Sequence, residues 1–464
     1  MLRLVAGQTE TLWDEALPIE VRELPEDLAA LDGLLDDPAL LGPIQAHWRR
    51  EVVETGRAVL TEGRPTIAMQ TFVRLMVLKT RHGWGYRTLM GEVSDSIHLR
   101  RFCRIALCER VPDESTVRKL TKRIGCETVD EVSRVLIETA VREQRFRARA
   151  VRIDSTVIEA DVKYPTDAGL AAHGVRGLAA EGRRLAAKIG QPKTRVRDRS
   201  RSMGRRLRAI SRTIRRRSGQ AKSEVLALTE QTGRLLKQSV REARRLAQAA
   251  RKRARGRGAQ AKLTAATRLD DLADRCEKVV EQITQRVTGQ PISDRLISLS
   301  DPDARPIRKG KLGKPNEFGY VSQIAEVTEH TRRGARGLIV PASSQIGNTH
   351  EDTLLPQTIS ELQRLGLSPR EVALDGGFTL TATTEALEDL APERVFIAGR
   401  QQPGSRRTQR RLQRYRTGAE GRISHLKRGY GLRRSRLKGH EGQKTTTGWG
   451  ILTYNLDTLT IRTR

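Results

Sequence analysis

The alternation of apolar and polar side chains in residues 148–160 constrains the fold more than any other feature of the sequence. The pattern predicts a β-strand that ends at the carboxylate of Asp154, after which Val157 begins a return strand. Residues 371–378 repeat this design, with an apolar strand that ends at Asp375 and is followed by two glycines. A strand holds its residues rigidly, so an acid at its end is well placed to bind a metal ion. A cap on the following turn is the alternative.

A third acid, Glu420, lies in a segment that is otherwise strongly basic. Residues 400–444 contain 15 Lys and Arg but only two acids. One interpretation of Glu420 is a surface salt bridge of low energy. The other is a metal-binding carboxylate on a surface that receives phosphates. Because Mg²⁺ takes hard oxygen ligands and usually more than one protein carboxylate, the second interpretation requires partners, and Asp154 and Asp375 are the candidates.

The positive charge is concentrated in parts of the chain. The protein has 464 residues and a net charge of +31, and residues 193–262 carry 24 Lys and Arg against four acids. The length predicts two or three domains, and the basic segments indicate a polyanion binder, most simply a nucleic-acid binder. A ribosomal-type RNA binder or a membrane-surface protein would share this charge. An RNA binder would be expected to have more aromatic residues than the 3% found here.

Cysteine usage and hydropathy predict the compartment. The four cysteines have neither CxxC spacing nor clustered histidines, which is typical of buried thiols in a reducing compartment. We find no signal-peptide pattern and no apolar run of the roughly 18 residues that a membrane span needs. The sequence therefore predicts a cytoplasmic, nucleoid-associated protein that does not enter a membrane.

The N-terminal part is predicted to be helical. Residues 1–60 form an acidic helical lead-in, and residues 61–140 form a helical DNA-binding domain with an apolar stripe that begins at Met69. Asp113 or Ser115 can cap a short helix from Val117 to Ile124. Its basic residues, which are candidates for DNA contact, include Arg118, Lys119 and Lys122. Short helices with one basic outer face suit a helix-turn-helix reader of the major groove, and a plain helical packing module is the alternative.

Residues 165–290 are predicted to be a basic helical insertion that interrupts the sheet. Apolar residues recur at alternating spacings of three and four from Leu269 to Val287, which indicates a coiled-coil seam. We therefore predict a long antiparallel helical hairpin. Three roles remain open for its basic face: clamping a DNA backbone through phosphates, pairing with another subunit, or forming a solvated arm.

Residues 145–164 and 291–464 together are predicted to form one catalytic domain. The fold class is mixed, α+β and α/β, because the strands are interrupted and followed by helices. In ribonuclease-H-like folds a mixed sheet of this order brings the first and fourth strands side by side, which would present Asp154 and Asp375 together. Three carboxylates in this setting can hold two Mg²⁺ ions about 4 Å apart for an in-line displacement at phosphorus.

Several motifs resemble those of bacterial insertion-sequence transposases of the DDE type. They are Val111–Thr116 in the N-terminal domain, Arg152-Ile-Asp154-Ser-Thr, Ala373-Leu-Asp375-Gly-Gly-Phe, and the terminal signature. That signature is Tyr, two residues, Arg, three residues, Glu, six residues, Lys. Arg416, Glu420 and Lys427 match it, whereas Gln413 occupies the tyrosine position and Tyr415 lies two residues on.

The resemblance implies a transposase that binds terminal inverted repeats, cleaves DNA strands and joins the freed 3′ hydroxyls to target DNA. Asp154, Asp375 and Glu420 would bind two Mg²⁺ or Mn²⁺ ions. Arg416, Lys427 and Arg422 would contact DNA, in an assembly that is a homodimer or larger. The alternatives are a non-catalytic derivative that only binds DNA ends, and a metal-dependent nuclease that does not join strands.

Overall fold

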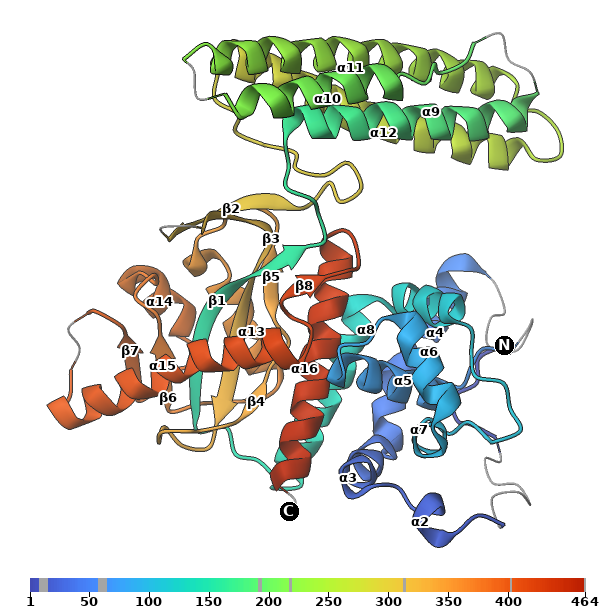
Figure 1. The fold of residues 1–464 in the computed structure, drawn as a ribbon. Coiled ribbons are helices and arrows are strands. Elements are labelled where there is room, and N and C mark those ends of the chain that lie inside the picture. The colour runs from blue at the N-terminus through green and yellow to red at the C-terminus, as the bar shows by residue number, and fades with distance from the viewer. Residues whose placement is uncertain are drawn as a thin grey trace. The chain divides into compact units, whose positions relative to one another are not determined.

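The computed structural model describes residues 1–7, 16–56, 65–190, 194–216, 219–311, 314–400 and 403–462. These residues form two compact units (Figure 1). Unit 1 comprises Met1–Asp161 and Gly319–Arg464, and unit 2 comprises Val162–Phe318. Each unit has a hydrophobic core of its own. No helix among the described residues is both long and apolar enough to span a membrane.

The first part of unit 1 is helical. Its helices in chain order are α2 (Ile19–Arg22), α3 (Glu26–Leu35), the 3-10 helix η1 (Pro38–Leu41), α4 (Gly42–Thr55), α5 (Met69–Arg81), α6 (Tyr86–Asp95), α7 (Ile97–Phe102) and α8 (Glu114–Arg142). The predicted apolar stripe of α5 is buried in the core. Asp113 caps α8 by accepting a hydrogen bond from the Ser115 N–H. Gly125, at φ 72°, divides α8, so that the predicted basic helix is its first segment.

The second part of unit 1 is organised around a mixed sheet, of which the strand at residues 305–311 falls within the residue range of unit 2. The strands of the sheet are β1 (Ala150–Ala160), β2 (Arg305–Lys311), β3 (Lys314–Thr328), β4 (Leu338–Ile339), β5 (Ser343–Gln345), β6 (Glu371–Leu374), β7 (Arg394–Ile397) and β8 (Arg434–Ser435). Their order is β2-β3-β1-β6-β7, with β4 and β5 paired to β3 and β8 paired to β1. β1 is antiparallel to β3 and parallel to β6, which is parallel to β7. As the sequence predicted, the sheet is mixed and β1 and β6 are neighbours.

One prediction about β1 is wrong. The strand does not end at Asp154, and Val157 does not begin a return strand, because β1 continues without a turn to Ala160. Every residue from Ala150 to Glu159 is paired with β3. A long antiparallel partner supplies hydrogen bonds along the whole strand, which a sequence-local pattern does not show. Asp154 therefore lies within a strand rather than at its end.

Five helices follow in the C-terminal half of unit 1. They are the 3-10 helix η2 (Glu351–Thr353), α13 (Leu355–Arg364), α14 (Leu380–Leu387), α15 (Arg406–Gly429) and α16 (His440–Arg462). α15 packs across β1, β6 and β7, and α16 lies between the sheet and the N-terminal helices (Figure 1). One core includes Phe72 of α5, Val151 of β1 and Trp449 of α16. The predicted boundary between the helical and catalytic domains thus falls inside unit 1.

Unit 2 differs from the predicted two-helix hairpin. Its helices α9 (Asp167–Ile189), α10 (Ser200–Ile214), α11 (Ala221–Lys252) and α12 (Ala259–Val287) form a bundle with a common core (Figure 1). The predicted seam of α12 faces this core, but α9 packs against α11 and α12 as well. Small residues permit this: a Cβ at Gly174 would lie 2.8 Å from the Cys276 sulfur. The alanine- and glycine-rich face of α9 was not recognised as a packing face because it has few large apolar residues.

Candidate functional site

Two neighbouring strands bring Asp154 and Asp375 together. β1 and β6 are parallel, and Ile153 pairs with Leu374 at the last registered position. Asp154 follows Ile153 and Asp375 follows Leu374, so the two acidic residues are adjacent across the strand pair. Asp375 directly follows β6, as predicted, and the glycines after it begin a turn.

The Asp154 side chain lies in an environment that disfavours its negative charge. The residue is 8% exposed, and its Oδ1 accepts a hydrogen bond of 2.8 Å from the Ser155 N–H. Burial and then the negative charge of Asp375 are the largest causes that raise the pKa of Asp154 to about 6. That hydrogen bond and Arg416 oppose the shift, and Glu420 adds a smaller effect that raises the pKa. Asp375 and Glu420 are therefore both close enough to Asp154 to act on it electrostatically. Perturbed carboxyls of this kind are typical of functional sites.

Helix α15 carries the third acid, Glu420, and the arginine Arg416, which contacts two of the three acids. Ser405 caps the helix by accepting a hydrogen bond from the Thr408 N–H. Arg416 lies 2.7 Å from an Asp375 oxygen and 3.2 Å from a Glu420 oxygen, measured from its two Nη atoms. Arg416 and Glu420 are one helical turn apart, which places them on one face of α15. The Glu420 side chain is 63% exposed, so it lies at the open side of the site.

The carboxylates supply the right donor chemistry for a divalent cation, but they do not surround one point. Among the described residues, no group of three or more His, Cys, Asp and Glu is close enough to hold a metal ion. Arg416 instead provides the positive charge between Asp375 and Glu420. Oxygen ligands from Asp154, Asp375 and Glu420 suit Mg²⁺ or Mn²⁺. These residues would hold the ion only after the side chain of Arg416 or Glu420 changes its position.

A buried ion-pair network beneath α15 was not predicted from the sequence. Arg152, two residues before Asp154, donates through Nε and Nη2 to the Glu326 carboxylate at 2.8 and 2.6 Å. It also donates through Nη1 to the Tyr415 carbonyl at 3.0 Å. Glu326 is 1% exposed and accepts further hydrogen bonds from the Arg422 Nε and the Gly337 N–H, each at 2.9 Å. Two strands and α15 are thereby fixed to one another.

This network changes the interpretation of Arg422 and Tyr415. The Arg422 side chain is only 14% exposed, and its partner is Glu326. Arg422 therefore joins α15 to β3, and its predicted contact with DNA stays a prediction. The Tyr415 hydroxyl lies 2.7 Å from the Thr328 hydroxyl, and the residue is 1% exposed. Tyr415 thus supports the sheet and does not take the position of the tyrosine that the terminal signature lacks. Lys427 lies farther along α15 and is partly buried.

A further carboxylate approaches the turn after Asp375. A Cβ at Gly377 would meet the Glu351 carboxylate group, so a side chain at this position would displace it. Asp352, next to Glu351, accepts a hydrogen bond of 3.0 Å from the Thr379 N–H. Glu351 and Asp352 thus hold the turn that follows β6. The double glycine was the sequence signal of this close approach.

The predicted DNA-contacting residues of the helical part are on the surface. Arg118, Lys119 and Lys122 are exposed on the first segment of α8. Arg118 also lines a cavity of about 610 Å³, together with Lys79, Arg433 and Arg436. Burial, with a smaller effect of Arg436, lowers the pKa of Lys79 to about 8. A concave surface lined by several cations is suited to an anion such as phosphate.

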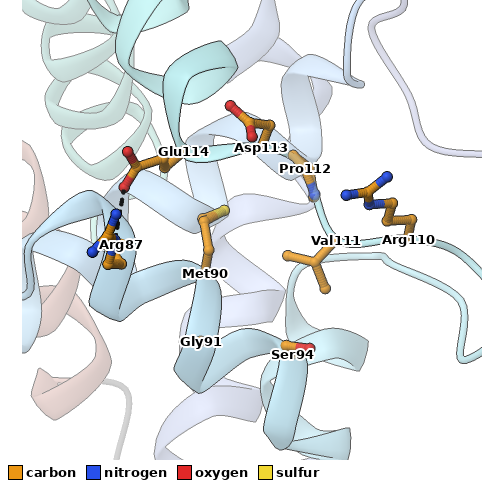
Figure 2. A pocket seen from close by; sticks show the side chains of 9 residues that line it. All are labelled: Arg87, Met90, Gly91, Ser94, Arg110, Val111, Pro112, Asp113 and Glu114. Carbon is orange, nitrogen blue, oxygen red and sulfur yellow. Dashed lines mark ion pairs between the residues drawn. The ribbon is translucent and has the colours of Figure 1, made fainter.

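A second cavity, of about 480 Å³, lies between α6 and the segment that leads into α8 (Figure 2). It is lined by Arg87, Met90, Gly91, Ser94 and residues 110–114. Arg87 faces Glu114 at 3.9 Å, and Asp113 adds a second negative charge to the wall. Because these acids offset the arginines, this cavity is less suited to phosphate than the basic cavity that includes Arg118.

The comparisons with known proteins agree with one part of the resemblance. Residues 24–123 match the family described as a transposase domain (DUF772). The match covers the helices from α3 to the first segment of α8, including Arg118, Lys119 and Lys122. It supports a transposase-type helical domain in unit 1. No curated protein and no solved structure matches the chain.

Proposed function

We propose that this protein is a DNA transposase of the DDE type, with Asp154, Asp375 and Glu420 as the metal-binding carboxylates of a ribonuclease-H-like catalytic domain. One observation carries the proposal. Strand pairing places Asp375 beside Asp154, and Arg416 contacts both Asp375 and Glu420, although the three acids are widely separated in the sequence. The transposase-domain match of residues 24–123 supports the same class of function independently.

Each site residue has a distinct role in this proposal. Asp154 and Asp375 are held on paired strands, so their positions are rigid. Glu420 is exposed on α15, and its side chain would change position to bind the ion. Bound Mg²⁺ or Mn²⁺ would activate the attacking oxygen and stabilise the leaving oxygen at phosphorus. Arg416 offsets the carboxylate charges in the free protein and is close enough to contact a DNA phosphate when DNA enters.

Binding of DNA would involve the cations of α15 near the site and the exposed cations of α8. Lys427 lies on the same helix as Glu420, and Arg118, Lys119 and Lys122 lie on the helix that the sequence predicts to enter the major groove. Double-stranded DNA would include both the element's ends and the target. Because two ends must be held together for strand transfer, we propose a homodimer or larger assembly on DNA.

The non-catalytic alternative is less consistent with the energetics of the site. A protein that only binds DNA gains nothing from three carboxylates beside its basic surface, since they repel phosphates. Asp154 is also buried at a cost to its charged form, which its raised pKa expresses. A binding role requires no such arrangement, whereas two-metal phosphoryl transfer does. A nuclease that cuts without joining would use the same site.

The test is a cleavage assay with a labelled duplex that carries the element's terminal repeat. We expect nicking at the repeat end with Mg²⁺ but not with EDTA. Asp154→Asn is expected to abolish nicking while DNA binding survives, and Asp161→Asn serves as the control because its side chain is 58% exposed and borders Arg434. Binding without nicking by the unmodified protein, in two-ended complexes with Mg²⁺, would support the non-catalytic alternative. Nicking without joined products would support the nuclease.

A further inference from the structure

Helix α10 of unit 2 carries a stripe of arginines. Its sequence has no Asp or Glu. The stripe consists of Arg201, Arg205, Arg208, Arg212 and, directly after the helix, Arg215. The spacings of four, three, four and three residues place these side chains on one face of the helix. All five residues are exposed.

The opposite face of α10 is fixed against the bundle. Met203 and Ile210 are buried, and Leu207 packs against the core of unit 2. Arg206, which lies outside the stripe, donates a hydrogen bond of 3.1 Å from its Nε to Gln231 of α11. Because one face is committed to packing, the arginine stripe is held outward. The helix cannot turn its charged face inward without exposing its apolar face.

The stripe arginines lack acidic partners, whereas several other arginines of unit 2 have them. Arg234 pairs with Glu230, and Arg251 pairs with Asp270. Arg184 and Arg244 also have carboxylate partners. None of the five stripe arginines forms an ion pair with any residue that the structure describes. Like charges one turn apart destabilise a helix, so the arrangement is unfavourable for folding alone.

We propose that the arginine stripe of α10 binds the phosphate backbone of duplex DNA without reading its sequence. The choice of DNA as the polyanion rests on the proposed function. The five arginines span about 21 Å at a rise of 1.5 Å per residue, which corresponds to about six base pairs. Charge complementarity is the recognition principle, since each arginine can neutralise one phosphate and release its counterions.

Other occupants fit the face less well. Single-stranded nucleic acid is usually held by aromatic residues on which bases stack, and α10 has none. An amphipathic helix that binds a bilayer inserts its apolar face, but the apolar face of α10 packs against the bundle except at Ile214, its last residue. A continuous basic face without aromatic or apolar residues is best suited to a regular phosphate array.

The experiment compares two variants of the full-length protein that have the same net charge. In one, Arg201, Arg205, Arg208 and Arg212 are each replaced by Gln. In the other, the acid-paired Arg184, Arg234, Arg244 and Arg251 are each replaced by Gln. Binding to a labelled duplex of unrelated sequence is measured in EDTA over a series of salt concentrations, and circular dichroism checks that both variants are folded.

We expect the stripe variant to bind at least about tenfold more weakly at 0.1 M salt than the unmodified protein. Its plot of log affinity against log salt should be less steep by about 3.6, because four phosphate contacts are lost and each removes about 0.9 from the slope. The control variant should change much less in both respects. Equal losses in the two variants would attribute the effect to net charge and overturn the proposal, as would an unchanged slope in the stripe variant.

Two further comparisons separate this proposal from its alternatives. If the stripe variant keeps duplex binding but loses binding to single-stranded RNA or to anionic vesicles, duplex DNA is not the occupant and the proposal is wrong. Mg²⁺-dependent nicking is measured separately. Duplex binding through the stripe without nicking would count against the catalytic proposal alone, and nicking with an unchanged salt slope would count against the stripe alone.

Discussion

At the scale of single residues, the site depends on where buried charges are placed. Asp154 is nearly buried on β1, next to Asp375 and under the influence of Glu420. Arg416 neutralises the two more exposed acids. Glu326 is more deeply buried than Asp154, but it accepts hydrogen bonds from two arginines and a backbone N–H. Buried charge is thus compensated in the network and only partly compensated in the site.

The raised pKa of Asp154 predicts a pH-dependent gain of stability in Asp154→Asn. The folded state holds the proton up to about pH 6, whereas the ordinary pKa is 3.8. This proton linkage stabilises the fold below about pH 4 and is lost as pH rises through about 6. We therefore expect the metal-free variant to be more stable than the unmodified protein by about 1 to 3 kcal/mol at pH 8, with the difference vanishing near pH 4.

The measurement is urea unfolding in EDTA at several pH values. Asp161→Asn provides the comparison, because the Asp161 side chain is 58% exposed and should give no pH-dependent gain. A stability difference between Asp154→Asn and the unmodified protein that is the same at pH 8 and at pH 4 would contradict the unfavourable environment of this carboxyl.

Removal of the Glu326 charge should be strongly destabilising. Glu326→Gln leaves Arg152 and Arg422 partly buried without their carboxylate, and loss of one partner of a buried pair costs about 3 to 5 kcal/mol. Denaturant unfolding measures this cost. Glu329→Gln is the matched change, since Glu329 pairs with Arg462 at a partly exposed position and should cost about 1 kcal/mol or less. Similar losses of stability in the two variants would show that the buried network contributes no more to stability than a partly exposed ion pair.

At the scale of elements, α15 is positioned by a close approach to β1. A Cβ at Gly418 would overlap the Arg152 guanidinium, which Glu326 and the Tyr415 carbonyl hold in place. The helix can therefore approach the strand only because residue 418 has no side chain. This approach determines where Arg416 and Glu420 reach the acids of the two strands.

Two glycine substitutions in α15 should have opposite effects. In an exposed helix Gly→Ala stabilises by about 1 kcal/mol, and Gly421→Ala should do so because no other group approaches that position. Gly418→Ala should instead destabilise the protein and reduce Mg²⁺-dependent nicking, since it separates α15 from β1. Thermal unfolding and the nicking assay measure both effects. If both substitutions stabilise, the helix does not depend on this contact.

At the scale of the whole molecule, the chain forms two units with separate cores. Unit 1 combines the N-terminal helices and the sheet around one core, and unit 2 is a four-helix bundle around another. The chain enters unit 2 after β1, so the strand that carries Asp154 and the strands that complete the sheet come from segments on both sides of the bundle. The proposed site lies in unit 1, and the proposed arginine stripe lies in unit 2.

Separate cores predict separate unfolding transitions. Leu236→Ala removes a fully buried side chain from unit 2, and Leu75→Ala removes one from unit 1. Each should lower the stability of its own unit by about 2 to 5 kcal/mol. Scanning calorimetry should show two transitions, with each substitution shifting a different one. A single transition that both substitutions shift would mean that the units unfold together.

The sequence by itself determined the local elements and the candidate acids. Alternation gave the strand that contains Asp154, the apolar run gave the strand before Asp375, and the basic helix with Glu420 followed from its composition. Periodicity depends on which side chains face a core, so it is encoded in neighbouring residues. The predicted domain boundaries and the metal-binding role of the acids stay predictions.

Only the tertiary structure decided which distant groups meet. The full length of β1, the four-helix packing of unit 2, the partnership of Arg422 with Glu326 and the position of Arg416 between two acids all depend on long-range contacts. An arginine has the same appearance in a sequence whether it is buried in an ion pair or exposed on a stripe. Its role is set by the carboxylates that the fold brings near it, and these come from remote parts of the chain.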